Sequence, residues 1–233
     1  MSLRLQLPIG SASLLLLWCS PHVSAAEQAP TPTTSVASLS VLEQRVREGE
    51  FAGTHSLIVV QHSKTIAEWY FEGQDETILN PLGFVKFTPD TLHDVRSVTK
   101  SVVSMLVGIA VSEGAIKDLD APVLDYFLEY KDLQTDARRT ISIRDMLSMT
   151  SGLHWSELTI PYTDPRNSEV AMYRAKDPYL YTLSQAIDTP AGDRWNYSGG
   201  DVAVLAAILT RAVKIPLETY AQLKTFWPMN IRF

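Results

Sequence analysis

Residues 96–111 read RSVTKSVVSMLVGIAV, and this stretch decides the fold. It is apolar on nearly every helical face and stops at Gly114. The pattern predicts a helix over 97–111 that is buried on all sides. Within it, Ser97 and Lys100 stand three residues apart and therefore on one face. We expect the hydroxyl and the amine to reach each other.

A serine and a lysine at this spacing suit nucleophilic catalysis. Serine is a poor nucleophile until a base takes its proton, and an amine beside apolar residues such as Val103 favours its uncharged, basic form. The helix N-terminus adds unpaired NH groups that favour negative charge on a reacting oxygen. In the structural alternative, Ser97 caps the helix and Lys100 is solvated. A lysine in a helix without a polar face needs a partner, which argues for the catalytic interpretation.

The segments before this helix predict one further helix and one hairpin. Ser40 followed by Glu43 forms a capping-box pattern, for a helix ending at Gly49. Residues 56–60 and 65–71 are rich in β-forming residues and flank a polar turn, so they predict a hairpin. The following segment, to about Leu92, is rich in Gly, Pro and Asp and predicts a loop.

The segments after this helix are mostly helical in pattern. Further helices are predicted from Asp120 and Pro122 to about Tyr130, from Ser142 and Asp145 to Gly152, over 201–213, and from Pro216 onward. No alternation of strands and helices indicates a parallel sheet, so the fold class is α+β.

The first 25 residues predict a secretory signal peptide, with Arg4, an apolar stretch around residues 14–17, and Val23-Ser24-Ala25 as a cleavage sequence. The apolar run is short for a membrane anchor, which is the alternative. Residues 26–37 predict a flexible lead and 38–233 one domain. Cys19, the sole cysteine, lies in the leader, so the mature chain would have no thiol chemistry. We expect a secreted or periplasmic protein with no stable membrane span after cleavage.

Charge and histidine spacing exclude other classes of function. The net charge of −6 argues against nucleic acid as a partner. His55, His62, His93 and His154 have no metal-binding spacing, and no GxSxG motif accompanies them. We therefore expect no metal and no cofactor.

Four stretches together resemble one known superfamily. His93-Asp94-Val95-Arg96-Ser97-Val98-Thr99-Lys100-Ser101 resembles the nucleophile motif of the β-lactamase-related esterases and amide hydrolases. This group belongs to the serine β-lactamase and penicillin-binding-protein superfamily and is similar to class C β-lactamases and to 6-aminohexanoate-dimer hydrolase. Residues 143–153, 190–199 and 216–229 agree with it, so the resemblance runs from about Ser38 to the end. It implies a β-lactamase-like (DD-peptidase-like) fold, with a helical subdomain and an antiparallel sheet.

The resemblance assigns roles to three residues. It implies Ser97 as nucleophile, Lys100 as base, and Tyr197 as the relay of the proton to the leaving group. The family has asparagine or a substitute two residues after the tyrosine, whereas this chain has Gly199. The donor that β-lactamases use on their substrate is therefore missing, which favours esters or simple amides. In the alternative, Tyr197 is an ordinary buried aromatic residue.

The N-glycosylation pattern at 196–198 is interpreted as coincidence, because a glycan would block the site.

An aromatic segment follows Gly152, where the resemblance implies a substrate-facing loop. Its members are Trp155, Tyr162, Tyr173, Tyr179 and Tyr181. They either contact substrate or pack the loop. Trp155, Tyr173 and Gly199 are the predicted substrate-binding residues.

The resemblance also implies a third motif, KTG or a replacement, on a strand well after Tyr197, and none is found before Phe233. The sheet is therefore expected to be incomplete and to lack its C-terminal strands. The second oxyanion NH would be absent too, the first being that of Ser97. Losing one such donor costs about 2.7 to 4 kcal/mol, and a two-stranded hairpin is not independently stable. The chain is expected to be incomplete at its C-terminus and weakly active or inactive.

The sequence thus predicts a serine hydrolase that forms an acyl-enzyme on Ser97 with a small-molecule ester or amide, or less favourably a β-lactam. One alternative is a D-alanyl-D-alanine carboxypeptidase-type peptidase. The other is a non-catalytic or inactive relative.

Overall fold

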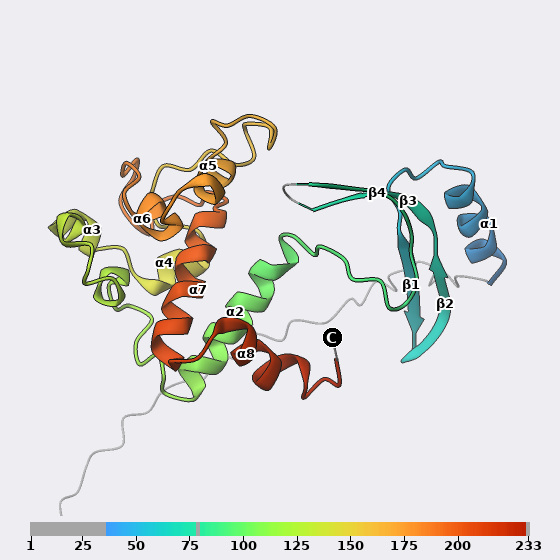
Figure 1. Ribbon diagram of the computed structural model, residues 1–233. Helices are drawn as coiled ribbons and strands as arrows, with labels where there is room; N and C mark the ends of the chain where they lie inside the picture. The colour runs from blue at the N-terminus through green and yellow to red at the C-terminus, as the bar shows by residue number, and fades with distance from the viewer. Residues whose placement is uncertain (1–35, 78–79, 232–233) are drawn as a thin grey trace, which may run out of the picture. The chain divides into compact units, whose positions relative to one another are not determined.

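The computed structural model describes residues 36–77 and 80–231 (Figure 1). They divide into two compact units between Thr91 and Leu92, and each unit is described by itself. The single domain expected over 38–233 stays a prediction. The expected signal peptide and nearly all of the expected lead lie outside the described residues. Within the described ranges, no helix is both long and apolar enough to cross a bilayer.

The predicted hairpin of the first unit is confirmed. Strand β1, Ser56–Gln61, pairs antiparallel with β2, Lys64–Tyr70. His62 and Ser63 form the turn with φ of 49° and 61°. Positive φ at both central residues matches the twist of a two-residue turn to that of its strands.

A second hairpin occupies the segment that the sequence predicted as a loop, so that prediction is wrong. Strand β3, Glu72–Glu76, pairs antiparallel with β4, Pro81–Lys86, with a register shift between Asp75 and Glu76. Pro81 is the first residue of β4, where its missing N–H is tolerated. Gly83 lies opposite Asp75 with φ of 80°. Proline and glycine are rare in strands, so residue propensities did not predict this hairpin.

Helix α1, Val36–Arg47, begins earlier than the predicted capping box and inside the predicted lead. It contacts β2 and helps to form a small core. The Arg47 guanidinium lies 5.1 Å from the ring centroid of Phe71, and His55 stacks on Phe87 at 3.9 Å. The buried apolar residues of this unit are Leu39, Val46, Ala67, Phe71 and Phe87.

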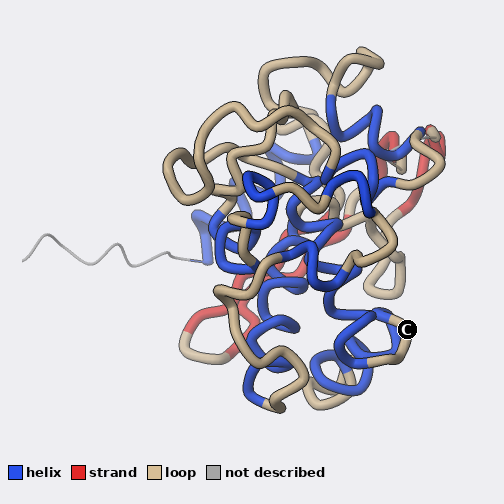
Figure 2. The backbone as a smooth tube through the Cα atoms, turned by 90° about the vertical axis from the view of Figure 1, so that its left-hand side faces the viewer, coloured by secondary structure: helices blue, strands red, loops and turns tan. Residues whose placement is uncertain are grey.

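The second unit is helical and is organised around α7, Gly199–Val213. Helices α2 (Val98–Ser112), α4 (Ile143–Ser148), α5 (Ser168–Arg174) and α6 (Pro178–Leu183) all contact α7 (Figure 1). Shorter elements connect them: α3 (Asp136–Arg139), α8 (Leu217–Ala221), the 3₁₀ turns Val123–Tyr126 and Lys131–Leu133, and a π turn Gln222–Phe226. The described strands, drawn in red in Figure 2, all precede Thr91 in the sequence.

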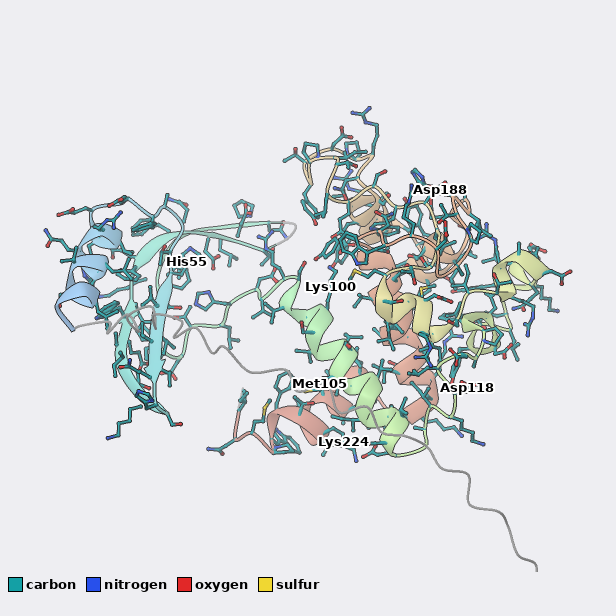
Figure 3. All side chains as sticks on the ribbon, turned by 180° about the vertical axis from the view of Figure 1, so that it is seen from behind. His55, Lys100, Met105, Asp118, Asp188 and Lys224 are labelled. Atoms are coloured by element: carbon teal, nitrogen blue, oxygen red, sulfur yellow. The ribbon has the colours of Figure 1, made fainter. Side chains whose placement is uncertain are left out.

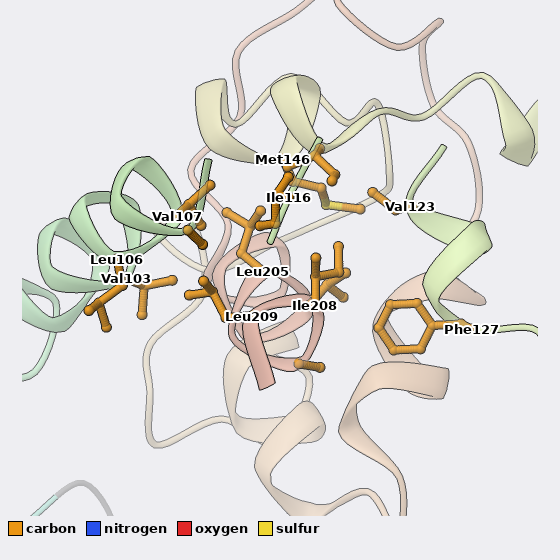
Figure 4. Close-up of a cluster of buried hydrophobic side chains, with 14 of the residues drawn as sticks. Val103, Leu106, Val107, Ile116, Val123, Phe127, Met146, Leu205, Ile208 and Leu209 are labelled. Atoms are coloured by element: carbon orange, nitrogen blue, oxygen red, sulfur yellow. The ribbon is translucent and has the colours of Figure 1, made fainter. Parts of the chain in front are cut away.

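The core of the second unit lies between α2 and α7 and continues to the 3₁₀ turn at 123–126. Figure 4 shows these side chains converging from separate elements. All of the following are at most 3% exposed: Val103, Leu106, Val107, Ile116, Val123, Phe127, Met146, Leu205, Ile208 and Leu209. Burying this many branched side chains supplies most of the stability of such a unit.

Helix α2 is not buried on all sides, which corrects the prediction. The face formed by Val103, Leu106, Val107 and Ala110 is buried, whereas Val98 is 63% and Met105 43% exposed. Figure 3 shows Lys100 near the start of α2 and Met105 further along it. When every face of a helix is apolar, the sequence does not show which face is buried. In α2, contact with α7 decides it.

Most of the other helix boundaries follow the predicted caps. Ser142 and Asp145 cap α4 as predicted, and the structure shows that they form a capping box, but α4 ends at Ser148 and not at Gly152. The predicted helices at 201–213 and after Pro216 are present as α7 and α8. The predicted helix ending at Tyr130 is wrong, because this segment contains only 3₁₀ turns.

Asp201 is a buried acid in the first turn of α7. It is 1% exposed. Its Oδ1 accepts hydrogen bonds from Ser151 Oγ at 3.0 Å and Ser198 Oγ at 3.1 Å. Within the described residues, Oδ2 has no hydrogen-bond partner. Burial, which disfavours the charged form, raises the pKa of Asp201 to about 7.

We expect the free energy of unfolding to fall as pH rises from about 4 to about 7, because native Asp201 then binds more proton than unfolded Asp201. Asp201→Asn should make this pH dependence shallower. Urea unfolding of parent and variant at about pH 5 and about pH 8 measures the difference. The exposed Asp132→Asn is the matched control. Equal pH dependence in parent and Asp201→Asn would contradict the prediction.

Candidate active site

Ser97 and Lys100 lie at the start of α2, as the spacing predicted. Lys100 Nζ donates a hydrogen bond to Ser97 Oγ at 3.2 Å. The Lys100 side chain is 16% exposed, so the amine is not out in solvent. Arg96, immediately before Ser97, has φ of 45°. A left-handed conformation in a non-glycine residue is strained, and such strain is typical of functional sites.

Tyr197 joins this pair from the loop that leads into α7. Its hydroxyl donates to Ser97 Oγ at 2.7 Å. Lys100 Nζ lies 4.9 Å from the centroid of the Tyr197 ring. Ser198, the next residue, caps α7 by accepting from Asp201 N. Helices α2 and α7 pack together, and their N-terminal ends bring the side chains of Lys100 and Tyr197 within hydrogen-bond distance of Ser97 Oγ.

Glu157 is a further member of the site that the sequence reasoning missed. It is 2% exposed and accepts hydrogen bonds from Trp155 Nε1 at 2.8 Å, Tyr162 OH at 2.8 Å and the Gly199 amide at 2.7 Å. Its Oε1 lies 3.8 Å from Lys100 Nζ. The partner of Lys100 is therefore a buried carboxylate, whereas the sequence argument considered apolar neighbours only.

Glu169, also missed, is a second buried acid beside Glu157. It is 6% exposed. Burial first, and then the charge of Glu157, raises the pKa of Glu169 to about 7, while the charge of Lys100 opposes the shift. The hydrophobic pattern of the sequence does not indicate that these two acids are buried, because the segment around them is of mixed polarity. A hint was available in the aromatic donors Trp155 and Tyr162, which flank Glu157 closely in the chain.

The predicted substrate-binding residues are placed differently from one another. Trp155 is 5% exposed, donates to Glu157 and leaves no room for a Cβ at Gly200. It packs the site from within, and its assignment as a substrate contact stays a prediction. Gly199 is buried too, and its amide bonds Glu157. Tyr173 is 50% exposed and remains a candidate contact.

The other aromatic residues of this segment divide between the site and the core. Tyr162 is 47% exposed, with its hydroxyl on Glu157. Tyr181 lies edge-on to Trp155 at 6.3 Å. The ring centroid of Tyr179 lies 6.3 Å from that of Phe127 in the core. Packing, the alternative left open by the sequence, thus accounts for Tyr179 and Tyr181.

Comparison with known proteins assigns the family. A family model described as Beta-lactamase matches residues 40–232. The chain belongs to the β-lactamase family. A curated relative, 6-aminohexanoate-dimer hydrolase of Paenarthrobacter ureafaciens, is 29% identical over 195 residues, which cover 77% of this chain and 43% of the relative.

Solved structures of the β-lactamase family share the fold. A class C β-lactamase from Rhodobacter sphaeroides has a TM-score of 0.59 at 20% identity, over 85% of this chain and 50% of that one. A putative 6-aminohexanoate-dimer hydrolase from Bacillus anthracis has a TM-score of 0.54 at 17% identity, over 77% and 43%. The chain therefore spans half or less of the length of these relatives. The predicted β-lactamase-like, α+β fold is confirmed.

Proposed function

We propose that the chain is a serine hydrolase that forms an acyl-enzyme on Ser97 and acts on esters or amides. The observation that carries the proposal is the convergence of two donors on one oxygen. Lys100 Nζ lies 3.2 Å and Tyr197 OH 2.7 Å from Ser97 Oγ. A serine hydroxyl within hydrogen-bond reach of a basic side chain is an arrangement that activates it as a nucleophile.

The acylation step follows from this geometry. Ser97 Oγ attacks the carbonyl carbon of the substrate and forms a C–O bond, while its proton passes to the uncharged Lys100 amine. The carbonyl oxygen becomes an oxyanion. The same proton then passes to the leaving alcohol or amine as the old bond breaks. Water repeats the sequence to release the acid and free Ser97.

The N-terminus of α2 stabilises the charge that develops in this step. The first amides of a helix have no intrahelical acceptor, and the helix dipole favours an anion there. The Ser97 amide lies at this position and is the oxyanion donor that the family resemblance implies. Preorganised donors of this kind supply much of the rate enhancement in acyl transfer.

The substrate class that we propose is a linear amide or an ester. Gly199 has no side chain to bind the amide of a β-lactam, and the curated relative is named for hydrolysis of an aminohexanoate dimer. We further propose a secreted or periplasmic location, on the basis of the leader-like residues 1–25.

We expect a fluorophosphonate probe to label the parent protein at Ser97, because the probe reacts with an activated serine hydroxyl. Ser97→Ala should abolish labelling, whereas Ser101→Ala, at an exposed position one turn away, should not. Labelling is measured by mass spectrometry of the modified peptide. Absence of labelling in folded parent protein would count against the proposal and favour a non-catalytic relative.

A further inference from the structure

Glu169 is a buried acid for which the steps described above have no use. It lies in the first turn of α5 and is 6% exposed. Within the described residues, its Oε2 has no hydrogen-bond partner. Leaving a buried carboxylate oxygen unpaired is costly, so a carboxyl in this position favours its protonated form.

Gly199 creates the space that Glu169 occupies. A Cβ at position 199 would lie 1.8 Å from Glu169 Oε2 and 2.5 Å from its Cδ. The carboxyl therefore fills the volume where any other side chain at this position would begin. The amide of the same glycine donates to Glu157 Oε2 at 2.7 Å. One residue without a side chain thus holds two acids together.

The two acids have unequal surroundings. Glu157 receives three hydrogen bonds and lies beside the Lys100 ammonium, which suits a carboxylate. Burial is the largest influence on Glu169 and raises its pKa to about 7, and the charge of Glu157 acts in the same direction. A proton shared by the pair therefore resides on Glu169.

We propose that Glu169 carries the single proton of a Glu157–Glu169 acid pair and that this proton governs the charge on Lys100. When Glu169 releases it to solvent, a second negative charge appears beside the Lys100 ammonium and holds Lys100 in that form. Ser97 then loses its base. Glu169 is thus a positioning residue that acts through Lys100, and the inference rests on the proposed function of Ser97.

Other titratable groups near the acid pair come from several elements of the second unit. Lys100 lies on α2, and Tyr173 on α5 with Glu169 itself. Tyr162 belongs to the segment after Glu157, donates a hydrogen bond to Glu157, and is influenced by the charges of both acids and of Tyr197, which leads into α7. Asp94, before α2, acts on Tyr173. Among these groups, Lys100 is the only cation, and its Nζ lies 3.8 Å from Glu157 Oε1.

The position of the proton is tested by ¹³C NMR of the full chain labelled at glutamate side-chain carboxyls. We expect one carboxyl to titrate near pH 7 in the parent and to be missing from Glu169→Gln. Gly199→Ala should displace the flexible carboxyl and return its titration toward the ordinary glutamate range. Gly108→Ala is the matched control, because a Cβ there meets nothing within 4 Å.

The effect on Ser97 is tested by the rate of fluorophosphonate labelling as a function of pH. Glu169→Gln mimics the protonated acid at every pH. It should keep the maximal rate and reach half of it at a lower pH than the parent, because one negative charge beside the site is gone. Gly108→Ala should superimpose on the parent.

Each outcome decides between the two proposals. Superimposable profiles for parent and Glu169→Gln, or no carboxyl titrating near neutrality, would overturn the inference while labelling of Ser97 leaves the proposed function standing. Loss of labelling in folded Glu169→Gln at every pH would also overturn it. No labelling of the parent overturns the proposed function and control through Lys100 together, and the NMR titration alone then decides whether the acid pair holds a proton.

Discussion

Lys100→Met is expected to slow fluorophosphonate labelling of Ser97 by about 100- to 10,000-fold, the range typical of losing a general base. Methionine keeps most of the length of the side chain and removes the amine that lies 3.2 Å from Ser97 Oγ. The ring of Tyr197 would remain, so a residual rate is expected. The measurement is the second-order labelling rate at fixed pH.

The matched control for this variant is Lys117→Met, at an exposed lysine after the end of α2. Its labelling rate should equal that of the parent. The variant also leaves Glu157 without its cation, so its fold must be checked by circular dichroism. A folded Lys100→Met protein that labels within about threefold of the parent would exclude Lys100 as the base.

Leu205→Ala is expected to lower the free energy of unfolding by about 2 to 5 kcal/mol, the usual cost of a cavity in a packed core. Leu205 is 2% exposed and lies on α7 in the core shared with α2. Urea unfolding followed by circular dichroism measures the loss. The labelling rate of Ser97 should also fall, because this core sets the separation of Ser97 and Tyr197.

The exposed Leu128→Ala serves as the control for the core variant, since Leu128 is 68% exposed. Its free energy of unfolding should change by less than about 0.5 kcal/mol. A similar loss in both variants would mean that the core shared by α2 and α7 does not stabilise the chain as described.

The helical parts of the fold were largely predictable from the sequence, because caps and apolar spacing act locally. Ser142 and Asp145 cap α4 as predicted, and α7 follows its apolar pattern. The β3–β4 hairpin was not predictable, since Gly83 and Pro81 belong to it for reasons of pairing and turn geometry. The buried face of α2 was also not predictable, because every face of this helix is apolar.

The candidate site was predictable in part. Helix periodicity predicted the meeting of Ser97 with Lys100, and the family resemblance added Tyr197 across 100 residues of sequence. Glu157 and Glu169 were missed, because burial of an acid depends on donors supplied by tertiary contacts. Trp155 was assigned to substrate on its chemistry alone, and its packing against Gly200 became visible only in the structure.

Ser97 and Tyr197 each precede a helix, and these helices share one core. The spacing between the reacting oxygens is therefore an outcome of how these two helices cross. Tyr173, whose exposed ring is the remaining candidate for contact with substrate, lies outside both helices, so changes at this position would alter which molecules are admitted without moving those oxygens. Such a separation of selectivity from reactivity offers one physical route by which a single scaffold accommodates hydrolases with different substrates.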